Sequence, residues 1–201
     1  MSRAPGGQTP SSTVGPFFAY GLTPRQYGYD LASIAHPVIA DDTVEGERIR
    51  IVGRVFDGAG APVSDAMVEL WQADAQGRYP GPNPGTNGAP NTGFRGFGRC
   101  GTGTDPHSRF VFETVKPGAP GDGQAPHVSV ILFMRGLLTH AYTRLYFSDE
   151  AEANGRDPVL AGVPEERRAT LIATREETDT GIAYLFDIHM QGERETVFFD
   201  V

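Results

Sequence analysis

Histidine and cysteine are the residues of this 201-residue chain that most readily bind metals or carry out acid–base chemistry. The five histidines are spread along the sequence, as His36, His107, His127, His140 and His189. No two of them have the H-x-H or H-E-x-x-H spacing that holds a metal, and the one cysteine, Cys100, disfavours a structural zinc site. The sequence also contains neither a G-x-S-x-G elbow nor a phosphate-binding G-x-x-x-x-G-K-[ST] loop, so acyl transfer and nucleotide hydrolysis have no support.

Three other candidates occur where a strand is expected to meet a loop: Tyr79, His127 and Arg135. His127 begins an expected strand, where its ring could either face a pocket or form an ordinary hydrogen bond within a sheet. Tyr79 could equally be a half-exposed packing residue, and Arg135 a solvated arginine that follows an apolar strand. Because the structural interpretation is the commoner one for each residue type, these residues alone predict no specific site.

Strands dominate the expected secondary structure. Runs of β-branched and aromatic residues between turn formers predict strands at residues 48–55, 66–72, 109–115, 127–134, 142–147, 184–190 and 195–199. Helix signals are few: residues 164–172 have proline and acids in the first turn and predict one surface helix, and residues 148–155 predict a single capped turn. Residues 80–98 form a long loop rich in Pro, Gly and Asn, a type that is usually functional or mobile. We therefore expect a mainly β protein, an antiparallel β-sandwich with long loops and one or two short helices.

The composition excludes several classes of protein. With 26 glycines and 16 prolines, an all-helical bundle is disfavoured. The net charge is −8 and no basic run is present, so neither nucleic acid nor a membrane surface is an expected partner. One cysteine excludes an intrachain disulfide, the N-terminus lacks the apolar core of a secretory signal, and the apolar run 130–134 is too short to span a bilayer. We expect a cytoplasmic protein.

Five ordered segments of the chain resemble the intradiol ring-cleavage dioxygenases. These segments are residues 13–17, 68–79, 114–118, 125–129 and 191–200, so the resemblance runs over most of the chain. Members of that family hold a mononuclear non-haem Fe(III) with two tyrosines and two histidines, donors that suit a hard cation. The catechol substrate chelates the metal, and dioxygen attacks the ring between the carbons that carry the hydroxyl groups.

Only half of the family's ligand pattern is present. Tyr79 falls on the first tyrosine position and His127 on the first histidine position. The second tyrosine should follow the K-P-G motif closely, but residues 117–126 contain no tyrosine. Ser129 replaces the second histidine of H-x-H, and Gln124 stands where an arginine is expected three residues before His127. The resemblance therefore implies that Tyr79 and His127 are vestigial ligand positions and that this chain binds no metal and has no catalytic residue of its own.

The resemblance is closest to family members that cleave protocatechuate and consist of an iron-free alpha chain and an iron-binding beta chain. It implies that Fe(III) is bound by the beta chain and that the partners are this beta chain, protocatechuate and O2, in a larger αβ oligomer. Residues 1–47 would form an arm at the partner interface and residues 48–201 the sandwich domain. Gly15 and Pro16 would bring backbone close to substrate in the partner's pocket, and the Arg135 guanidinium would suit the substrate carboxylate.

Two functions from different classes follow from this resemblance. In the first, the chain completes the pocket of an oxygenase that converts protocatechuate and O2 to 3-carboxy-cis,cis-muconate. In the second, it is a purely structural subunit that stabilises the catalytic chain without contributing to the pocket. An autonomous dioxygenase would need all four ligands in one chain, and a carbohydrate-binding sandwich is supported only by scattered aromatic residues.

Overall fold

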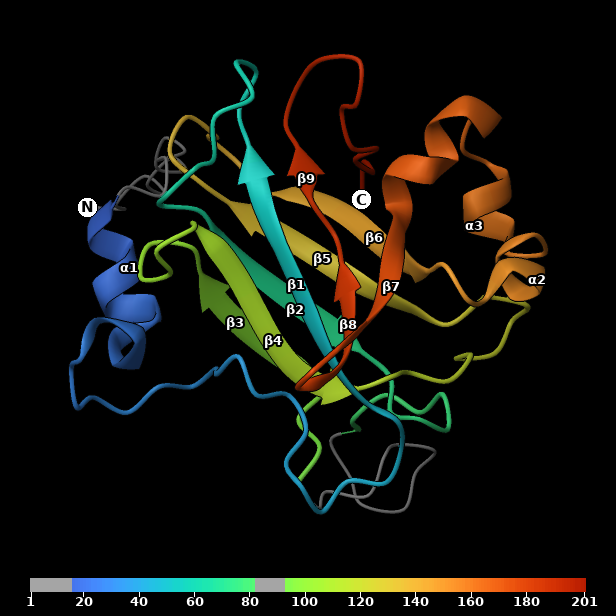
Figure 1. Cartoon of the computed structure of the whole chain (residues 1–201), viewed down its shortest axis with the longest axis horizontal. Helices are drawn as coiled ribbons and strands as arrows, with labels where there is room; N and C mark the ends of the chain where they lie inside the picture. The colour runs from blue at the N-terminus through green and yellow to red at the C-terminus, as the bar shows by residue number, and fades with distance from the viewer. Residues whose placement is uncertain (1–15, 82–92) are drawn as a thin grey trace, which may run out of the picture.

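The computed structural model describes residues 16–81 and 93–201 (Figure 1). Short helices flank a large set of strands: α1 lies at one side of the strands, and α2 and α3 lie together at the other side (Figure 1). In chain order the elements are α1 (Pro16–Leu22), the 3-10 helix η1 (Pro24–Tyr27), β1 (Arg48–Phe56), β2 (Met67–Gln72), β3 (Phe97–Gly101), β4 (Arg109–Val115), β5 (His127–Phe133), β6 (Ala141–Phe147), α2 (Ala151–Asn154), α3 (Pro158–Ala161), the 3-10 helix η2 (Glu165–Leu171), β7 (Ile172–Thr178), β8 (Gly181–Leu185) and β9 (Ile188–His189).

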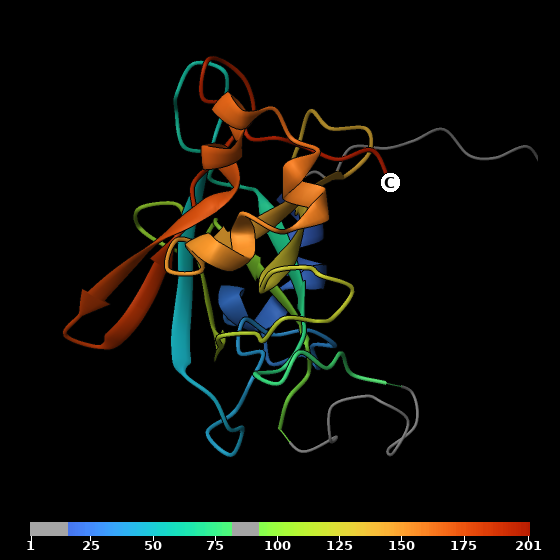
Figure 2. The ribbon, with the colours of Figure 1, turned by 90° about the vertical axis from the view of Figure 1, so that its right-hand side faces the viewer.

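The strands form two packed layers connected by one strand. The hydrogen-bonded order is β3-β2-β5-β6-β7-β8-β1-β4, and β9 pairs with β1. β7 connects the layers because Ile172 and Ala173 pair with β6, and Thr174 to Thr178 then pair with β8. The second view shows the β7–β8 hairpin extending away from the other strands (Figure 2). The predicted mainly β sandwich is confirmed, although β1–β8, β1–β9 and β6–β7 are parallel pairs within an otherwise antiparallel arrangement.

The core lies between the layers and follows the alternation of the strands. In β1 the side chains of Ile49, Ile51 and Val55 are buried, whereas the arginines between them point outward. Phe110 and Phe112 of β4 join the same apolar cluster. These residues explain why a sequence rich in glycine and proline still folds around a substantial apolar core.

A segment of the N-terminal region covers the outer edges of β3 and β4. The backbone N–H of Arg99 in β3 donates to the carbonyl of His36 (3.1 Å), and the N–H of Ile39 donates to the carbonyl of Glu113 in β4 (2.8 Å). Ile39 is fully buried. The segment therefore satisfies edge groups of both layers and closes the sandwich on this side.

Several predicted elements differ in type or extent from those observed. The surface helix predicted at residues 164–172 is present as the 3-10 helix η2 (Glu165–Leu171). Residues 184–190 divide between β8 and β9, and residues 195–199 contribute only one isolated bridge, Tyr142 with Phe199. The predicted loop 80–98 ends in β3, and β7, α1, η1 and α3 were not predicted. The predicted turn at 148–155 contains α2. Among the described residues, no helix is both long and apolar enough to cross a membrane.

Candidate functional site

The structure brings Tyr79 and His127 together at one end of the β2–β5 pair. The Tyr79 hydroxyl lies 3.5 Å from Nε2 of His127. His127 is buried at the first position of β5, and Tyr79 is half-buried beyond the end of β2. The two vestigial ligand positions inferred from the resemblance are therefore neighbours in space.

A tight turn places Tyr79 beside the segment that follows β4. The buried carboxylate of Asp74 accepts hydrogen bonds from the backbone N–H groups of Gln76 and Arg78, both at 2.9 Å. Gly77 at the turn has a φ of +79°, and the N–H of Gly118 donates to the carbonyl of Asp74 (2.9 Å). A Cβ on Gly118 would lie 2.5 Å from the carbonyl oxygen of Ala75. The two segments thus pack with backbone against backbone, which requires glycine at this contact.

The protonation of His127 follows from its contacts. Its Nδ1 lies 2.9 Å from the carbonyl oxygen of Ala125, which can only accept, so Nδ1 carries the hydrogen and Nε2 presents a lone pair to the Tyr79 hydroxyl. Burial lowers the pKa of the His127 ring, and the Arg144 guanidinium lowers it further, against the effect of the Ala125 carbonyl. Burial raises the pKa of the Tyr79 hydroxyl, with Arg144 acting in the opposite direction. At neutral pH the pair is therefore a neutral phenol next to a neutral imidazole.

A buried carboxylate holds the chain that leads into His127. Asp157 is fully buried; one of its oxygens accepts from the N–H of Ala125 (2.8 Å) and the other from the Tyr146 hydroxyl (3.0 Å). Asp157 also caps α3 by accepting from the N–H groups of Val159 and Leu160. Burial, together with Asp157, raises the pKa of Tyr146 to about 12. Asp157 thus links α3, β6 and the start of β5.

Arg144 supplies a guanidinium that the sequence pattern did not predict at this site. It belongs to β6, and the β5–β6 register pairs it with Ser129. Its Nη1 donates to the side-chain oxygen of Gln124 (2.9 Å) and lies 3.5 Å from the Tyr146 hydroxyl. Within the described residues it forms no ion pair with a carboxylate. An arginine therefore contacts Gln124, the residue found where the family has arginine, but it comes from the neighbouring strand.

Trp71 forms the solvent side of the same site. Its ring stacks on Tyr79 with the centroids 5.7 Å apart and the planes 12° apart, and 36% of Trp71 is exposed. The β2–β5 register pairs Trp71 with Ser129. Trp71, Ser129 and Arg144 therefore occupy one row across β2, β5 and β6. Neither Trp71 nor Arg144 was singled out from the sequence, and the alternation of the two strands was the only signal that could have placed them there.

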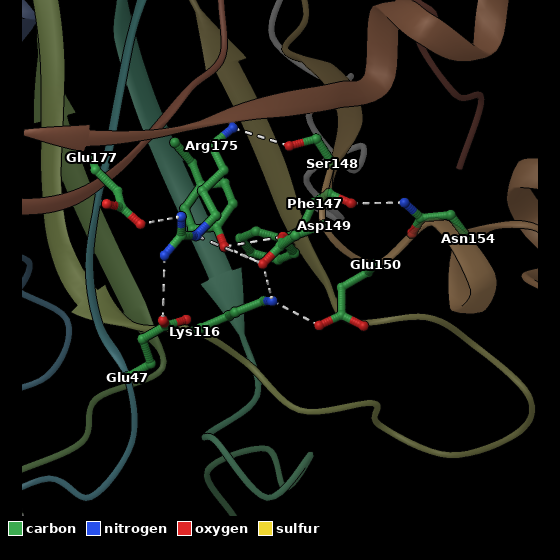
Figure 3. Close-up of polar contacts among 10 residues, drawn as sticks. Glu47, Lys116, Phe147, Ser148, Asp149, Glu150, Asn154, Arg175 and Glu177 are labelled. Atoms are coloured by element: carbon green, nitrogen blue, oxygen red, sulfur yellow. Dashed lines mark hydrogen bonds and ion pairs between the residues drawn. The ribbon is translucent and has the colours of Figure 1, made fainter.

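A charged cluster holds the other end of the segment that faces Tyr79 (Figure 3). The Lys116 ammonium lies 2.7 Å from carboxylate oxygens of both Asp149 and Glu150. Burial lowers the pKa of Lys116, but these two carboxylates outweigh it and raise the pKa above its ordinary value. Burial, then the Asp149 contact, raises the pKa of Tyr184 to about 12. Arg175 of β7 joins the cluster through Asp149, with its Nε 3.9 Å from a carboxylate oxygen of that residue. Charges that follow β4 and β6, together with one from β7, therefore fix the start of residues 116–120.

These residues do not fit the ferric ion that the resemblance implies for the family. One phenol and one imidazole are present where four donors are expected, and Ser129 contributes only a neutral hydroxyl. In the parts of the chain that the structure describes, no group of three or more His, Cys, Asp or Glu side chains is arranged to hold a metal.

The expected pocket residues lie away from this site or outside the described residues. Gly15 is outside the described residues, as is the side chain of Pro16, the first residue of α1. Arg135 follows the far end of β5, and at about 3.3 Å per residue the strand separates His127 from its last residue by roughly 20 Å. Arg135 is exposed, and its Nε lies 2.9 Å from a carboxylate oxygen of Asp65. The structure therefore separates Arg135 from Tyr79 and His127.

Comparison with known proteins relates this fold and site to one family. Residues 23–192 match the family model described as dioxygenase. The chain is 56% identical over 195 residues to the protocatechuate 3,4-dioxygenase alpha chain of Burkholderia cepacia, covering 96% of this chain and 98% of that one. It is 36% identical over 161 residues to the beta chain from the same organism, covering 75% and 67%. The dioxygenase domain of a dioxygenase carbohydrate-binding protein fusion from Streptomyces sp. SirexAA-E has a similar fold, with a TM-score of 0.56, 21% identity and coverage of 84% and 93%.

Proposed function

Because this chain belongs to the dioxygenase family, we propose that it is the alpha chain of a two-chain protocatechuate 3,4-dioxygenase and binds no iron itself. The observation that carries this proposal is the incomplete donor set, in which Tyr79 and His127 contact each other while Ser129 and residues 117–126 supply no further ligand. The similarity to a relative named as an alpha chain supports the same assignment.

The ferric ion then belongs to a beta chain, where it supplies activation of the catechol ring toward O2 in the reaction that gives 3-carboxy-cis,cis-muconate. A relative named as a beta chain is 36% identical to this chain, which supports a partner with a related sandwich. We expect the two chains to assemble as an αβ unit within a larger oligomer, in the cytoplasm.

The N-terminal region is the part of this chain that we assign to the partner interface. Phe18, Tyr29, Leu31 and Ile34 are 51%, 50%, 56% and 90% exposed. With Tyr20, which is 43% exposed, they make five large apolar side chains exposed within 17 residues. Such a group is unusual for the surface of a monomer, whereas interfaces of permanent complexes are rich in them. The nearby segment around Ile39 closes the sandwich, so the arm is attached to a fixed part of the fold.

We assign Arg135 a role in binding the carboxylate of the substrate in the partner's pocket. Its guanidinium is 64% exposed at the end of a rigid strand, and its contact with Asp65 fixes the orientation. Both Asp65 carboxylate oxygens are buried, and neither accepts a hydrogen bond from the residues that the structure describes. The ion pair between Arg135 and one of these oxygens is therefore the contact that compensates the carboxylate. Removing Arg135 alone would therefore leave the buried charge of Asp65 unpaired. A test of Arg135 by its effect on activity needs a control for the loss of this ion pair.

Expression of the chain with and without its partner tests the assignment. Alone, the chain should carry no stoichiometric iron and show no ring cleavage. With the partner, it should give a ferric complex with tyrosinate-to-iron absorption in the visible range. An iron-containing, active preparation of the chain alone would disprove the proposal, because its residues supply too few donors.

A comparison of variants in the assembled complex separates the pocket-completing role from a purely structural one. Asp65→Asn with Arg135→Ala removes the guanidinium without leaving an unpaired carboxylate, and Asp65→Asn alone is the matched control. If Arg135 binds the carboxylate directly, the double variant should lose about 10- to 100-fold in kcat/KM for protocatechuate relative to Asp65→Asn, but little for catechol, which has no carboxylate. Equal losses on both substrates, or no loss, would favour the purely structural subunit.

A further inference from the structure

A pocket that includes neither Tyr79 nor His127 lies where η1, the segment that closes the sandwich and the residues before β3 meet. Its volume is about 240 Å³, and its lining includes Arg25, His36, Asp41 and Arg95. Three of these four side chains are cationic or can become so. The chain as a whole carries a net charge of −8, so this grouping opposes its general charge.

The positive charge in this pocket exceeds the negative charge of its lining, where Asp41 is the one carboxylate among the described residues. Within residues 16–81 and 93–201, neither Arg25 nor Arg95 has a carboxylate within 4.0 Å. Asp41 lines the pocket, but its Oδ1 accepts from the N–H of Thr43 (2.9 Å) and from its hydroxyl (2.6 Å). After burial, the charges of Arg95 and Arg25 are the main causes that lower the pKa of His36. The Asp41 carboxylate keeps its charge and interacts with that of Arg95 without forming an ion pair, so two guanidiniums share a single counter-charge in this pocket.

The backbone that carries these side chains is well fixed. The N–H of Arg95 donates to the carbonyl of Ile39 (2.9 Å), and the carbonyl of His36 accepts from Arg99 (3.1 Å). Gln26, next to Arg25 in η1, accepts from the N–H of Gly101 (2.8 Å) through its side-chain oxygen. The two arginines and the histidine thus project from rigid segments, which lowers the entropy cost of closing on a ligand.

We propose that this pocket binds a small oxyanion, a carboxylate or phosphate-type group, with the Arg25 and Arg95 guanidiniums as the principal donors and the His36 ring beside them. Two guanidiniums supply several charge-assisted hydrogen bonds in a geometry that matches planar or tetrahedral oxygen groups. The pocket volume of about 240 Å³ is well above the roughly 10–15 Å³ that one water molecule needs, so a small oxyanion fits in it. The proposal uses no residue of the Tyr79 site and does not depend on iron or on ring cleavage.

Titration with inorganic phosphate and with benzoate tests the proposal, using the chain in the form in which it purifies, with its partner if the two copurify. Binding is measured by calorimetry at constant ionic strength set with sodium chloride. The variants are Arg25→Gln and Arg95→Gln. The matched control is Arg54→Gln, which removes an arginine of β1 that does not line the pocket. Arg25 and Arg95 are exposed, so these variants should fold normally.

We expect saturable binding of at least one of the two anions by the wild-type chain and by Arg54→Gln. Arg25→Gln and Arg95→Gln should each weaken that binding at least tenfold. Preference for phosphate or for benzoate would identify which oxygen group the pocket takes. Absence of saturable binding for both anions, or equal affinities in the pocket variants and Arg54→Gln, would overturn the proposal. Because the readout is binding, a failure here is independent of whether the complex cleaves protocatechuate.

Discussion

Asp157 offers a direct test of how the Tyr79 site is held. Its carboxylate is fully buried and accepts four hydrogen bonds: one oxygen accepts from Ala125, and the other accepts from Tyr146, Val159 and Leu160. Substitution by asparagine keeps the shape but leaves one oxygen. If that oxygen keeps the three bonds on its own side, the amide NH2 faces the N–H of Ala125, and a hydrogen bond becomes a repulsive contact between two donors.

The size of the effect follows from these contacts. A hydrogen bond to a charged acceptor contributes about 1.5–3 kcal/mol, and the three remaining bonds weaken because their acceptor becomes neutral. We expect Asp157→Asn to lower the free energy of unfolding by about 2–4 kcal/mol. For a single domain of this length that corresponds to a decrease in Tm of roughly 4–16 °C. Turning the amide over would keep the Ala125 bond but set the NH2 against the N–H donors of Val159 and Leu160, so it gives no relief.

Thermal unfolding followed by near-UV circular dichroism measures this change. Asp187→Asn is the matched control, because Asp187 is exposed and accepts one hydrogen bond, from the N–H of Arg54. The control should change stability by less than about 1 kcal/mol. If Asp157→Asn were no more destabilising than Asp187→Asn, the carboxylate would not be what anchors Ala125 and the start of β5.

Three further substitutions test other contacts. Gly118→Ala should lower the free energy of unfolding, measured in urea, by about 1–3 kcal/mol, because the added Cβ would meet backbone atoms. Gly101→Ala is the control, since a Cβ there would have no neighbour closer than 3.6 Å, and it should not lower this free energy. Equal effects of the two variants would contradict the packing argument. The Arg109 hydrogen bond, opposed by burial, lowers the pKa of Asp105 from 3.8 to about 2, so this group stabilises the fold above pH 4 and the contribution is lost as the pH falls toward 2. Asp105→Asn should thus flatten the stability profile between pH 4 and 2, and an unchanged slope would argue against it. Lys116→Met should lower the free energy of unfolding by about 1–3 kcal/mol in the same urea assay, because it leaves two carboxylates without their ammonium partner. An unchanged free energy of unfolding would mean that the cluster in Figure 3 does not stabilise the start of residues 116–120.

The strands that could be predicted from the sequence are those with one buried and one exposed face. β1 alternates arginine with aliphatic residues, and β4 was predicted with its observed bounds, because both lie across the core. The sequence of β7 shows no such alternation of buried and exposed residues. Only the beginning of β7 pairs with β6, and its charged remainder belongs to the projecting β7–β8 hairpin. Charged residues such as those before and within β7 favour helix locally. The sequence therefore predicted the surface helix at residues 164–172, which the structure shows as η2, but no strand after it.

The candidate site likewise contains residues that local motifs predict and residues that only strand pairing brings together. Tyr79 and His127 were found because each belongs to a contiguous motif whose spacing is visible in the sequence. Arg144 was not, because it reaches Gln124 only through the register in which β6 pairs with β5, and no local pattern encodes that register. The consequence is chemical: a fixed positive charge lies beside the two remaining ligand positions, and Tyr79 and His127 satisfy each other as neutral groups. Adding back a histidine at position 129 would therefore restore one donor but leave the second phenolate missing. We expect Ser129→His alone to bind no stoichiometric ferric ion when iron is measured by elemental analysis, and stoichiometric iron in that variant would show that one phenol and two imidazoles suffice to hold it.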